Sequence, residues 1–520
     1  MAAGCCHDFR GEHRLPVVGE RRDQRLQHRE LVRRRRARSG RTPAARRARR
    51  ASPLRARRPR PQRIRCCRRH GLPLQRRPRG DRPLPRALVA HRRRPARARV
   101  DHPRRRHSAA VNVFFHTFGC RANQYDTELV RLAFTATGAT VVDDPAAADV
   151  AVVNSCTVTG ESEAKLRRFV GRIARGREGL ETVVIGCAAA LDDGRIAALP
   201  SVRAVVGGAD PETVLQALGV TPVPDLPVAS RPAGQGVRHR ALLKIQDGCD
   251  EHCTFCATTL ARGANRSRPV AELVAEARAL SRHHAEIVLT GVHIGTYGLD
   301  RATENRQPTT LGGLLEALVT ALPHVRFRLS SIEATEVDDT IARLLIEAPR
   351  NLAAHLHAPL QSGSDRVLKR MGRHWYTARS YRARLEWLAE RLPVFGLGAD
   401  IIAGFPGETD ADHRATVALV QALPFTYLHV FPFSVRPDAP AAKLAGRLPP
   451  PVIKGRAAEL RALGDLKARA YRNRRTGELA DGVVSGRLAG RLDAVTQDYL
   501  SVYLSTEDWD GRARFEVRIA

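Results

Sequence analysis

The segment KIQDGCDEHCTFC, residues 244–256, contains the pattern on which the rest of the chain depends. Its cysteines, Cys249, Cys253 and Cys256, are spaced C-x3-C-x2-C. Iron–sulfur clusters are normally held by four cysteines, so three that lie this close predict a four-iron cluster with one iron open to a small molecule. A structural zinc site is the alternative, but the segment lacks the paired C-x2-C units typical of structural zinc.

Composition separates the first fifth of the chain from the rest. The chain has 520 residues and a net charge of +34. Residues 1–110 are rich in arginine, contain no lysine and have Phe9 as their one aromatic residue, so nearly all the excess charge lies there. Such a segment cannot bury enough apolar surface to fold, which predicts a disordered extension. An RNA-binding arm is one interpretation, and a misassigned start with Val111 as the first native residue is the favoured one.

Three features of the sequence bear on where the protein lies in the cell: its apolar segments, its N-terminus and its number of cysteines. No stretch has the roughly 18 apolar residues that a membrane helix needs, and no secretory signal is evident at the N-terminus. The chain has 10 cysteines in 520 residues, too sparse for a disulfide-stabilised protein. We therefore expect a cytoplasmic protein without a membrane partner.

From Val111 onward, predicted strands and helices alternate, which indicates an α/β protein with parallel sheets. Residues 111–222 predict a doubly wound sheet, with strands at 111–117, 150–153, 182–186 and 202–206. Residues 236–465 predict a second unit, with strands at 241–245, 286–289, 325–330, 354–358, 396–402 and 427–431. Six such units favour a partial barrel, open on one side, over a complete eight-unit barrel. Residues 470–520 predict a small β-barrel.

A second set of cysteines, Cys120, Cys156 and Cys187, is spread over the first sheet. Each of them follows a predicted strand by a few residues. In an open parallel sheet the loops after the strands gather at one edge, where ligands bind. We therefore expect these cysteines to converge on a second three-cysteine metal site. The alternative is three unrelated buried thiols, since free cysteine is commonly buried.

Several polar or glycine-containing loops follow the predicted barrel strands and should line the barrel mouth. They supply carboxylates and amides for a ribose and an amine, glycine for close backbone approach, and apolar walls for an adenine. These groups suit S-adenosylmethionine (SAM). The candidate cofactor-binding residues are Gly291, Glu333, Gln361, Asp400 and Phe255.

With these residues assembled, the chain resembles the methylthiotransferase family of radical-SAM enzymes from Val111 to about Leu504. The resemblance rests on the two three-cysteine sets, in order, and on a final segment similar to a TRAM domain, a small RNA-binding β-barrel. Residues 117–128 (TFGCRANQYDTE), 289–295 (LTGVHIG) and 329–333 (LSSIE) are most similar to the branch that acts on threonylcarbamoyladenosine in tRNA. One departure is the segment ATTL at 257–260, where the family has a more apolar stretch with a proline.

Three alternatives to that branch remain. The isopentenyladenosine branch usually carries Gln-Asn where Val292-His293 stands. The ribosomal-protein branch typically has Pro-Lys where Arg121-Ala122 stands. A non-catalytic RNA-binding iron–sulfur protein would bind RNA without cleaving SAM.

The resemblance implies that the two cysteine sets have different roles. The set at 249–256 would hold a [4Fe-4S] cluster that cleaves SAM to a 5′-deoxyadenosyl radical, and the set at 120, 156 and 187 an auxiliary [4Fe-4S] cluster that supplies the methylated sulfur. The target, an adenine C2–H bond, has no useful acidity, so general-base catalysis is excluded and the cofactor must carry the step. Both clusters must face one cavity, which predicts that the N-terminal sheet edge caps the barrel mouth.

The implied substrate is adenosine 37, next to the tRNA anticodon, because an unstacked loop nucleotide can be offered to an enclosed pocket. Phosphate contacts are expected from basic residues near the barrel mouth and on the last segment of the chain. The resemblance further implies an electron donor such as flavodoxin or ferredoxin, and a monomer. The phosphate-contact candidates are Arg262, Arg266, Arg268, Lys369, Arg370 and Arg373.

Overall fold

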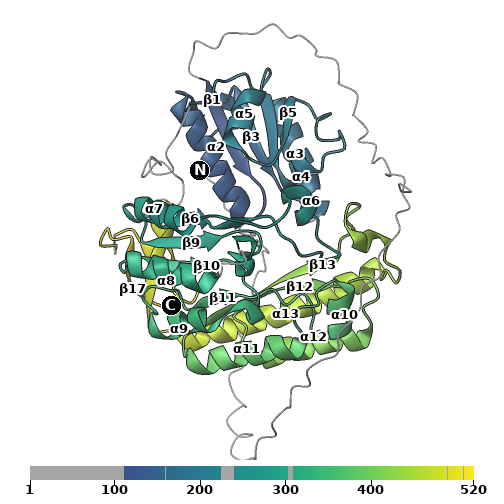
Figure 1. The fold of residues 1–520 in the computed structure, drawn as a ribbon, viewed down its shortest axis with the longest axis vertical. Helices are drawn as coiled ribbons and strands as arrows, with labels where there is room; N and C mark the ends of the chain where they lie inside the picture. Colours follow the sequence, from purple (N-terminus) through teal and green to yellow (C-terminus); the bar gives the residue numbers. More distant parts are fainter. Residues whose placement is uncertain (1–110, 158–159, 224–238, 302–308, 489, 508) are drawn as a thin grey trace, which may run out of the picture. The chain divides into compact units, whose positions relative to one another are not determined.

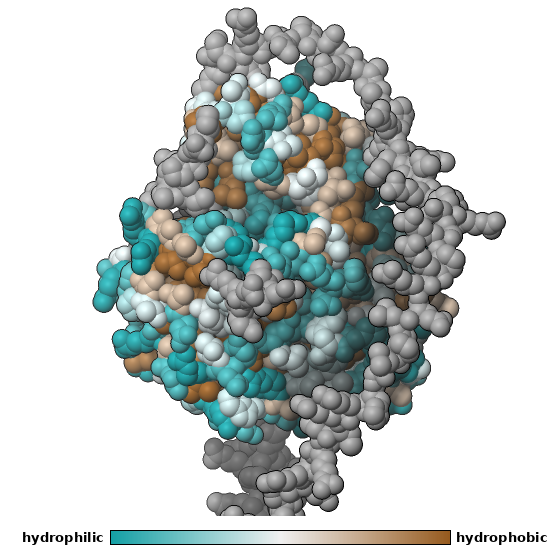
Figure 2. All heavy atoms as spheres, in the orientation of Figure 1, coloured by the Kyte–Doolittle hydropathy of each residue, from teal (hydrophilic) through white to brown (hydrophobic). Residues whose placement is uncertain are grey.

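The computed structural model describes residues 111–157, 160–223, 239–301, 309–488, 490–507 and 509–520 (Figure 1). The predicted disordered extension, residues 1–110, lies outside the described residues. Within the described part, no helix combines the length and apolar character needed to cross a membrane. On the face shown in Figure 2, apolar residues form separate patches among polar ones.

The first part is a five-stranded parallel sheet in the order β2-β1-β3-β4-β5, with an apolar core on each face. Neighbouring residues of a strand point to opposite faces, so Val152 packs with helices α2 and α5 while Val153 packs with α3 and α4. This is the predicted doubly wound sheet. Its elements are β1 (Asn112–Thr117), α2 (Arg121–Ala136), β2 (Thr140–Val142), β3 (Val150–Ser155), α3 (Gly160–Gly176), β4 (Glu181–Gly186), α4 (Cys187–Ala190), β5 (Val202–Gly207) and α5 (Pro211–Ala217).

The second part contains the six predicted βα units. Its strands form two three-stranded parallel sheets, β10-β9-β6 and β11-β12-β13. Two single parallel bridges join these sheets, one between Phe327 and Leu352 and one between Ser331 and His357. The barrel is therefore partial, as predicted. Its strands and main helices are β6 (Ala241–Lys244), α6 (Thr258–Arg262), α7 (Val270–Ser281), β9 (Glu286–Thr290), α8 (Leu311–Ala321), β10 (Arg326–Leu329), α9 (Asp339–Glu347), β11 (His355–His357), α10 (Asp365–Arg370), α11 (Ala378–Arg391), β12 (Gly396–Ala403), α12 (Asp410–Ala422) and β13 (Tyr427–Pro432). A short ribbon of β7 (Gln246–Asp247) and β8 (Arg266–Ser267) flanks the cysteine segment.

The two faces of the barrel strands differ sharply in polarity. The helix-facing residues, such as Leu243, Leu289 and Ile401, belong to one large apolar core. On the opposite face, the last three strands carry polar side chains that touch one another, whereas Leu242 of β6 and Val288 of β9 pack with Tyr125 of α2. Gly398 makes room for the polar side chains, because a Cβ there would lie 2.0 Å from Cζ of Tyr427. We call this interior side of the barrel, from β10 to β13, the lumen.

The third part consists of α13 (Pro450–Arg475) and a four-stranded antiparallel sheet in the order β16-β15-β14-β17. It forms a half-barrel at the position where the sequence predicts a small β-barrel. Buried Arg326 and Arg328 of β10 share Glu286 and donate to backbone carbonyls of this sheet, which fixes it to the barrel. Its strands are β14 (Leu479–Leu488), β15 (Arg491–Thr496), β16 (Ser501–Ser505) and β17 (Arg514–Arg518).

Candidate functional site

The three cysteines of the first sheet lie at the carboxyl ends of adjacent strands. Cys120 follows β1 and caps α2, Cys156 follows β3, and Cys187 opens α4 directly after β4. Sγ of Cys120 and Sγ of Cys187 each lie 3.8 Å from Oδ1 of Asn123. A Cβ on Gly119 would lie 2.8 Å from Sγ of Cys156. The sequence-distant thiols therefore come together at one sheet edge.

A helix terminus and an arginine near this set favour negative sulfur, whereas burial opposes it. Cys120 lies at the N-terminus of a 16-residue helix, where the helix dipole favours negative charge. Nε of Arg262 donates to Sγ of Cys187 over 3.2 Å. Burial raises the pKa of the Cys187 thiol, and the positive charge of Arg262 opposes that rise.

The second set lies in the loop between β7 and α6, which backbone hydrogen bonds hold from both sides. Cys249 N donates to Gly263 O over 3.0 Å, and Thr254 N donates to Met371 O over 2.8 Å. Gly248 permits the entry to the loop: its φ is +73°, and a Cβ there would lie 1.9 Å from Ala264 O. The loop is thus fixed by the backbone rather than by its cysteines.

Each sulfur of this loop has a polar neighbour. Cys253 accepts from Arg373 over 3.6 Å, Cys249 lies 3.8 Å from Nδ1 of His293, and Cys256 accepts from Thr258 N over 3.3 Å. Burial raises the pKa of the Cys253 thiol to about 11, although Arg373 opposes the rise. Within the ATTL segment, Thr259 Oγ1 donates to Cys249 O over 3.1 Å, a contact that an apolar side chain cannot make.

Both sets fit iron–sulfur clusters. Each offers three sulfurs outside any disulfide, with N–H or guanidinium groups that donate to sulfur, and such hydrogen bonds tune the properties of a bound cluster. The same guanidinium of Arg262 that contacts Cys187 also donates to Asp247, two residues before Cys249, over 2.8 Å. One buried side chain therefore spans the two sets, so the edge of the first sheet lies against the barrel mouth.

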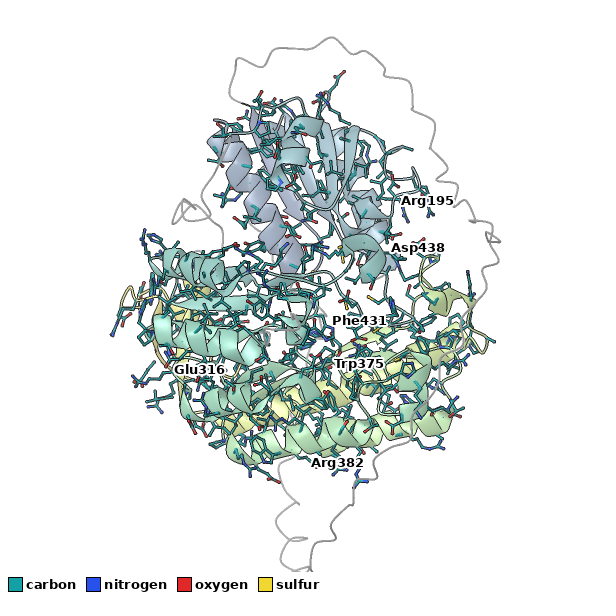
Figure 3. All side chains as sticks on the ribbon, in the orientation of Figure 1. Arg195, Glu316, Trp375, Arg382, Phe431 and Asp438 are labelled. Carbon is teal, nitrogen blue, oxygen red and sulfur yellow. The ribbon has the colours of Figure 1, made fainter. Side chains whose placement is uncertain are left out.

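Two of the predicted cofactor-binding residues lie beside the cysteine loop. Glu333 accepts from Arg373, which contacts Cys253, and from Nε1 of Trp375 over 2.6 Å (Trp375 is labelled in Figure 3). Gly291 packs so closely on Gln246 that a Cβ would lie 2.8 Å from its carbonyl oxygen. Glu333 is thus tied to the loop through one arginine, and Gly291 lies where no side chain fits.

The other three candidates lie around the barrel wall. Phe255, inside the cysteine loop, packs on the small apolar cluster that contains Met371 and Phe405. Gln361 has a φ of +61° and donates its backbone N–H to Asp400 O over 2.8 Å. The Asp400 carboxylate pairs with two imidazoles, Nε2 of His357 at 3.0 Å and Nδ1 of His429 at 3.2 Å.

The prediction of phosphate contacts was wrong for three of its six residues. Arg262, Arg268 and Arg373 have side chains only 9%, 23% and 6% exposed and are bound in internal ion pairs with Asp126, Glu276 and Glu333 respectively. Arg370 donates to two backbone carbonyls. Exposed Arg266 and Lys369 remain predictions.

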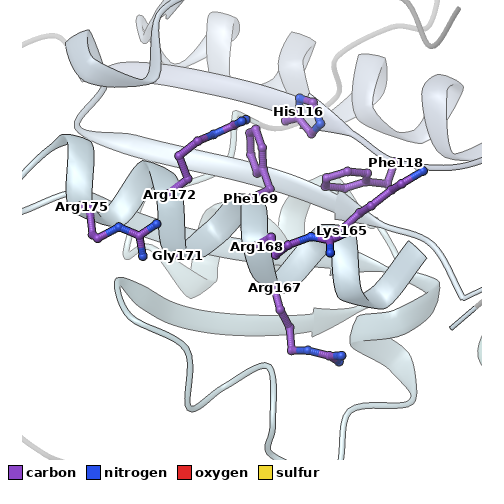
Figure 4. A pocket seen from close by; sticks show the side chains of 9 residues that line it. All are labelled: His116, Phe118, Lys165, Arg167, Arg168, Phe169, Gly171, Arg172 and Arg175. Carbon is purple, nitrogen blue, oxygen red and sulfur yellow. The ribbon is translucent and has the colours of Figure 1, made fainter. Parts of the chain in front are cut away.

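A basic surface that the sequence analysis missed lies on α3. We define the basic stripe as Lys165, Arg168, Phe169, Arg172 and Arg175, whose spacing puts them on one face of the helix. The stripe borders a hollow of about 620 Å³ that Phe118 and His116 also line (Figure 4). Burial and Arg172 lower the pKa of His116 to about 4, and its neutral ring stacks on Phe169 with centroids 4.0 Å apart. The helical spacing of arginines in residues 165–175 was the available signal.

Comparison with known proteins gives two family matches. Residues 112–207 match the uncharacterized protein family UPF0004, and residues 243–420 match the radical SAM superfamily. Among solved structures, the radical S-adenosylmethionine methyltransferase TsrM from Kitasatospora setae aligns with a TM-score of 0.49 at 15% identity, covering 64% of this chain and 77% of that chain.

Curated relatives align over most of their length. The chain is 37% identical to the threonylcarbamoyladenosine tRNA methylthiotransferase MtaB of Bacillus subtilis, over 77% of this chain and 92% of the relative. It is 37% identical to the enzyme of the same name from Thermotoga maritima, over 65% and 78%. It is 33% identical to the tRNA-2-methylthio-N(6)-dimethylallyladenosine synthase of Novosphingobium aromaticivorans, over 73% and 88%. With its two cysteine sets, the chain belongs to the radical-SAM methylthiotransferase family, whose cofactors are S-adenosylmethionine and iron–sulfur clusters.

Proposed function

We propose that this protein adds a methylthio group to C2 of N6-threonylcarbamoyladenosine at position 37 of tRNA, with two [4Fe-4S] clusters. The observation that carries the proposal is the Arg262 guanidinium, which contacts Cys187 of one set and Asp247 beside the other. Sulfur insertion needs a sulfur source and a radical source at the same carbon. Two cysteine sets against one barrel mouth provide that arrangement.

When bound, the clusters and S-adenosylmethionine supply the carbon-centred radical and the methylated sulfur that acid–base groups cannot supply. The chain's part is to bind and orient. Cys249, Cys253 and Cys256 would hold one cluster, and the set at 120, 156 and 187 the other. Arg373 and Arg262 donate N–H groups to one sulfur of each set, which fixes the direction in which those thiolates point.

We assign S-adenosylmethionine to the wall between the cysteine loop and the carboxyl ends of the barrel strands. Gly291 lets the loop after β9 pack closely on Gln246 near the cysteine loop, and Phe255 offers an apolar face inside that cysteine loop. Glu333, held by Arg373 and Trp375, is a fixed carboxylate for the amine or ribose. Gln361 offers an amide at the end of β11, and Asp400 uses Oδ1 for both imidazoles, which leaves Oδ2 for the cofactor.

Two observations favour the threonylcarbamoyladenosine branch of the family: the names of the relatives and the polarity of the lumen. The 37% relatives are named for threonylcarbamoyladenosine, and the 33% relative for dimethylallyladenosine. A threonylcarbamoyl group carries a carboxylate and a hydroxyl, whereas a dimethylallyl group is apolar. The lumen of this chain is lined by His355, His357, His429 and Tyr427, which suits the polar group. We also propose a monomeric cytoplasmic enzyme reduced by a flavodoxin or a ferredoxin.

The test of the function is nucleoside analysis of tRNA from a strain without this protein. We expect 2-methylthio-N6-threonylcarbamoyladenosine to disappear, its unmethylthiolated precursor to accumulate, and the gene to restore the product. An unchanged 2-methylthio pool contradicts the proposal. Loss of the methylthio group from a dimethylallyl or isopentenyl nucleoside instead assigns the protein to the other tRNA branch.

We further propose that the basic stripe on α3 binds the tRNA backbone. Among the described residues no carboxylate pairs with Arg168, Arg172 or Arg175, so their charges are available to phosphates. The bordering Phe118 is two residues before Cys120, which places the hollow near the auxiliary set. Aromatic rings beside arginines, here those of the partly buried Phe118 and Phe169, are typical of single-stranded nucleic-acid sites.

Replacing Arg168 and Arg172 together by glutamine is expected to weaken binding of an anticodon stem-loop about 10-fold at moderate salt. Loss of two phosphate contacts should also reduce the slope of log K against log salt concentration by roughly 1.5. Fluorescence anisotropy at several salt concentrations measures both quantities.

The matched control replaces Arg343 of α9 and Arg382 of α11, which are 45% and 50% exposed and paired with Glu316 of α8 and Glu386 of α11. This double variant removes two positive charges, as the variant of the basic stripe does. Equal weakening by both double variants would show a non-specific charge effect and refute the assignment of the stripe.

A further inference from the structure

The lumen contains a cation without an anion. Arg121, directly after Cys120, is half-buried, and its Nη2 donates to Oη of Tyr499 over 2.8 Å. No carboxylate of the described residues pairs with it. A guanidinium held away from bulk water normally has an anionic partner, because desolvating an unpaired charge is costly.

The surroundings of Arg121 show that it lies in the lumen. Tyr499, in the turn between β15 and β16, stacks on His355 of β11 with centroids 4.4 Å apart and lies 5.3 Å below the guanidinium carbon of Arg328 of β10. Burial and then the charges of Arg328 and Arg121 hold the pKa of His355 well below its usual value. The neighbouring arginine, Arg328, already has Glu286 as its partner, whereas Arg121 has a neutral phenol.

The phenol is itself held in one place. Tyr499 has a φ of +70°, and its ring also packs 5.5 Å from the ring of Tyr427. The turn that carries it abuts the start of β12, where a Cβ on Gly396 would lie 2.1 Å from Asp498 O. The C-terminal sheet thus inserts an aromatic side chain into the barrel and fixes the direction of Arg121. This leaves the remaining guanidinium N–H groups for a ligand.

We propose that Arg121 binds the threonyl carboxylate of N6-threonylcarbamoyladenosine, with Tyr499 as its positioning residue. This inference rests on the proposed function and names the residue that would select its substrate. The bidentate geometry of arginine matches a carboxylate. Arg121 is adjacent to Cys120, so a base held by its N6 substituent would lie beside the auxiliary set. His429, 55% exposed on the same wall, is available to the hydroxyl or carbamoyl group.

A backbone phosphate is the other source of an anion. The ring of Tyr499 lies among strands β10, β11 and β13, so a group that reaches Arg121 must enter the barrel. A flipped base can enter in this way, whereas the continuous backbone stays outside. The two sources differ in a measurable respect: only the carboxylate can be neutralised by esterification.

The test compares two anticodon stem-loops that carry N6-threonylcarbamoyladenosine or its methyl ester, with kcat/KM for the methylthio product measured by mass spectrometry. We expect the iron-loaded wild type to prefer the acid about 10- to 100-fold, as for a charge-assisted hydrogen bond. Arg121→Gln should abolish the preference, Arg121→Lys should retain part of it, and Tyr499→Phe should reduce it several-fold. Arg382→Gln, on the outer face of α11 (Figure 3), should keep it.

The outcomes separate this inference from the function on which it rests. Equal wild-type rates on acid and ester overturn the inference and leave the proposed function intact. An equal loss on both RNAs in Arg121→Gln, with about eight irons still bound, also overturns it and indicates a structural or phosphate contact. Absence of product from every RNA tested overturns both.

Discussion

Replacing Cys156 by alanine is expected to halve the iron content of the reconstituted protein, from about eight to about four atoms per chain, and to abolish methylthiolation. Cys156 is 5% exposed and packs against Gly119 through its Cβ, which alanine retains. The fold should therefore survive while one of three sulfurs at the auxiliary set is lost. Anaerobic iron counting and mass spectrometry of the RNA product measure the two effects.

Cys253→Ala is the matched variant in the other set. It should also leave about four irons, but it should abolish formation of 5′-deoxyadenosine from S-adenosylmethionine, which Cys156→Ala should preserve. The account fails if both variants lose cleavage and methylthiolation in the same proportion, since one shared cluster would then explain both sets.

Replacing Arg262 by methionine is expected to lower the free energy of unfolding by about 3 kcal/mol, because it leaves buried carboxylates with one cation fewer. Arg262 donates to Asp126 at 2.9 Å and to Asp247 at 2.8 Å, and Lys244 is the other cation that pairs with both carboxylates. Urea titration of the anaerobically purified protein measures the change. Arg266→Met is the control: its side chain is 59% exposed, its nitrogen lies 4.0 Å from Asp247, and we expect a change within about 0.5 kcal/mol.

Arg262→Met should also change how the free energy of unfolding depends on pH in acid. Burial alone would raise the pKa of Asp247, but Lys244 and Arg262 lower it from 3.8 to about 2. A carboxyl with a depressed folded-state pKa contributes stability above its unfolded pKa and loses that contribution as the pH falls through the folded value. Arg262→Met should therefore show a smaller loss of stability between about pH 4 and pH 2 than the wild type. An unchanged pH dependence in acid would show that Arg262 does not hold this carboxylate.

Much of the architecture is predictable because burial imposes simple periods on the strands. Residues 150–153, all apolar, indicate a strand covered on both faces, and the barrel strands β10 (RFRL) and β11 (HLH) alternate between polar and apolar residues. Strand β2 was not predicted because its three residues, at the edge of the sheet, are too few to show an alternation of apolar and polar side chains. Helix α5 was missed because its seven residues bury only Val214 and Leu215.

The convergence of Cys120, Cys156 and Cys187 was predictable from topology, because carboxyl ends of adjacent parallel strands must meet. The partners of the arginines were not. Whether Arg262 faces solvent or a buried aspartate depends on contacts between residues more than 100 positions apart, such as Arg262 with Asp126. For the same reason the sequence could not reveal that Tyr499 reaches Arg121.

The central claim is that two cysteine-held clusters act on one base in one chamber. Its most direct test supplies the iron-loaded full chain with S-adenosylmethionine, a reductant and an anticodon stem-loop containing N6-threonylcarbamoyladenosine, and counts methylthio groups in the RNA by mass spectrometry. We predict one methylthio group per modified adenosine, on C2. Cleavage of S-adenosylmethionine that leaves this RNA without any methylthio group would contradict the account.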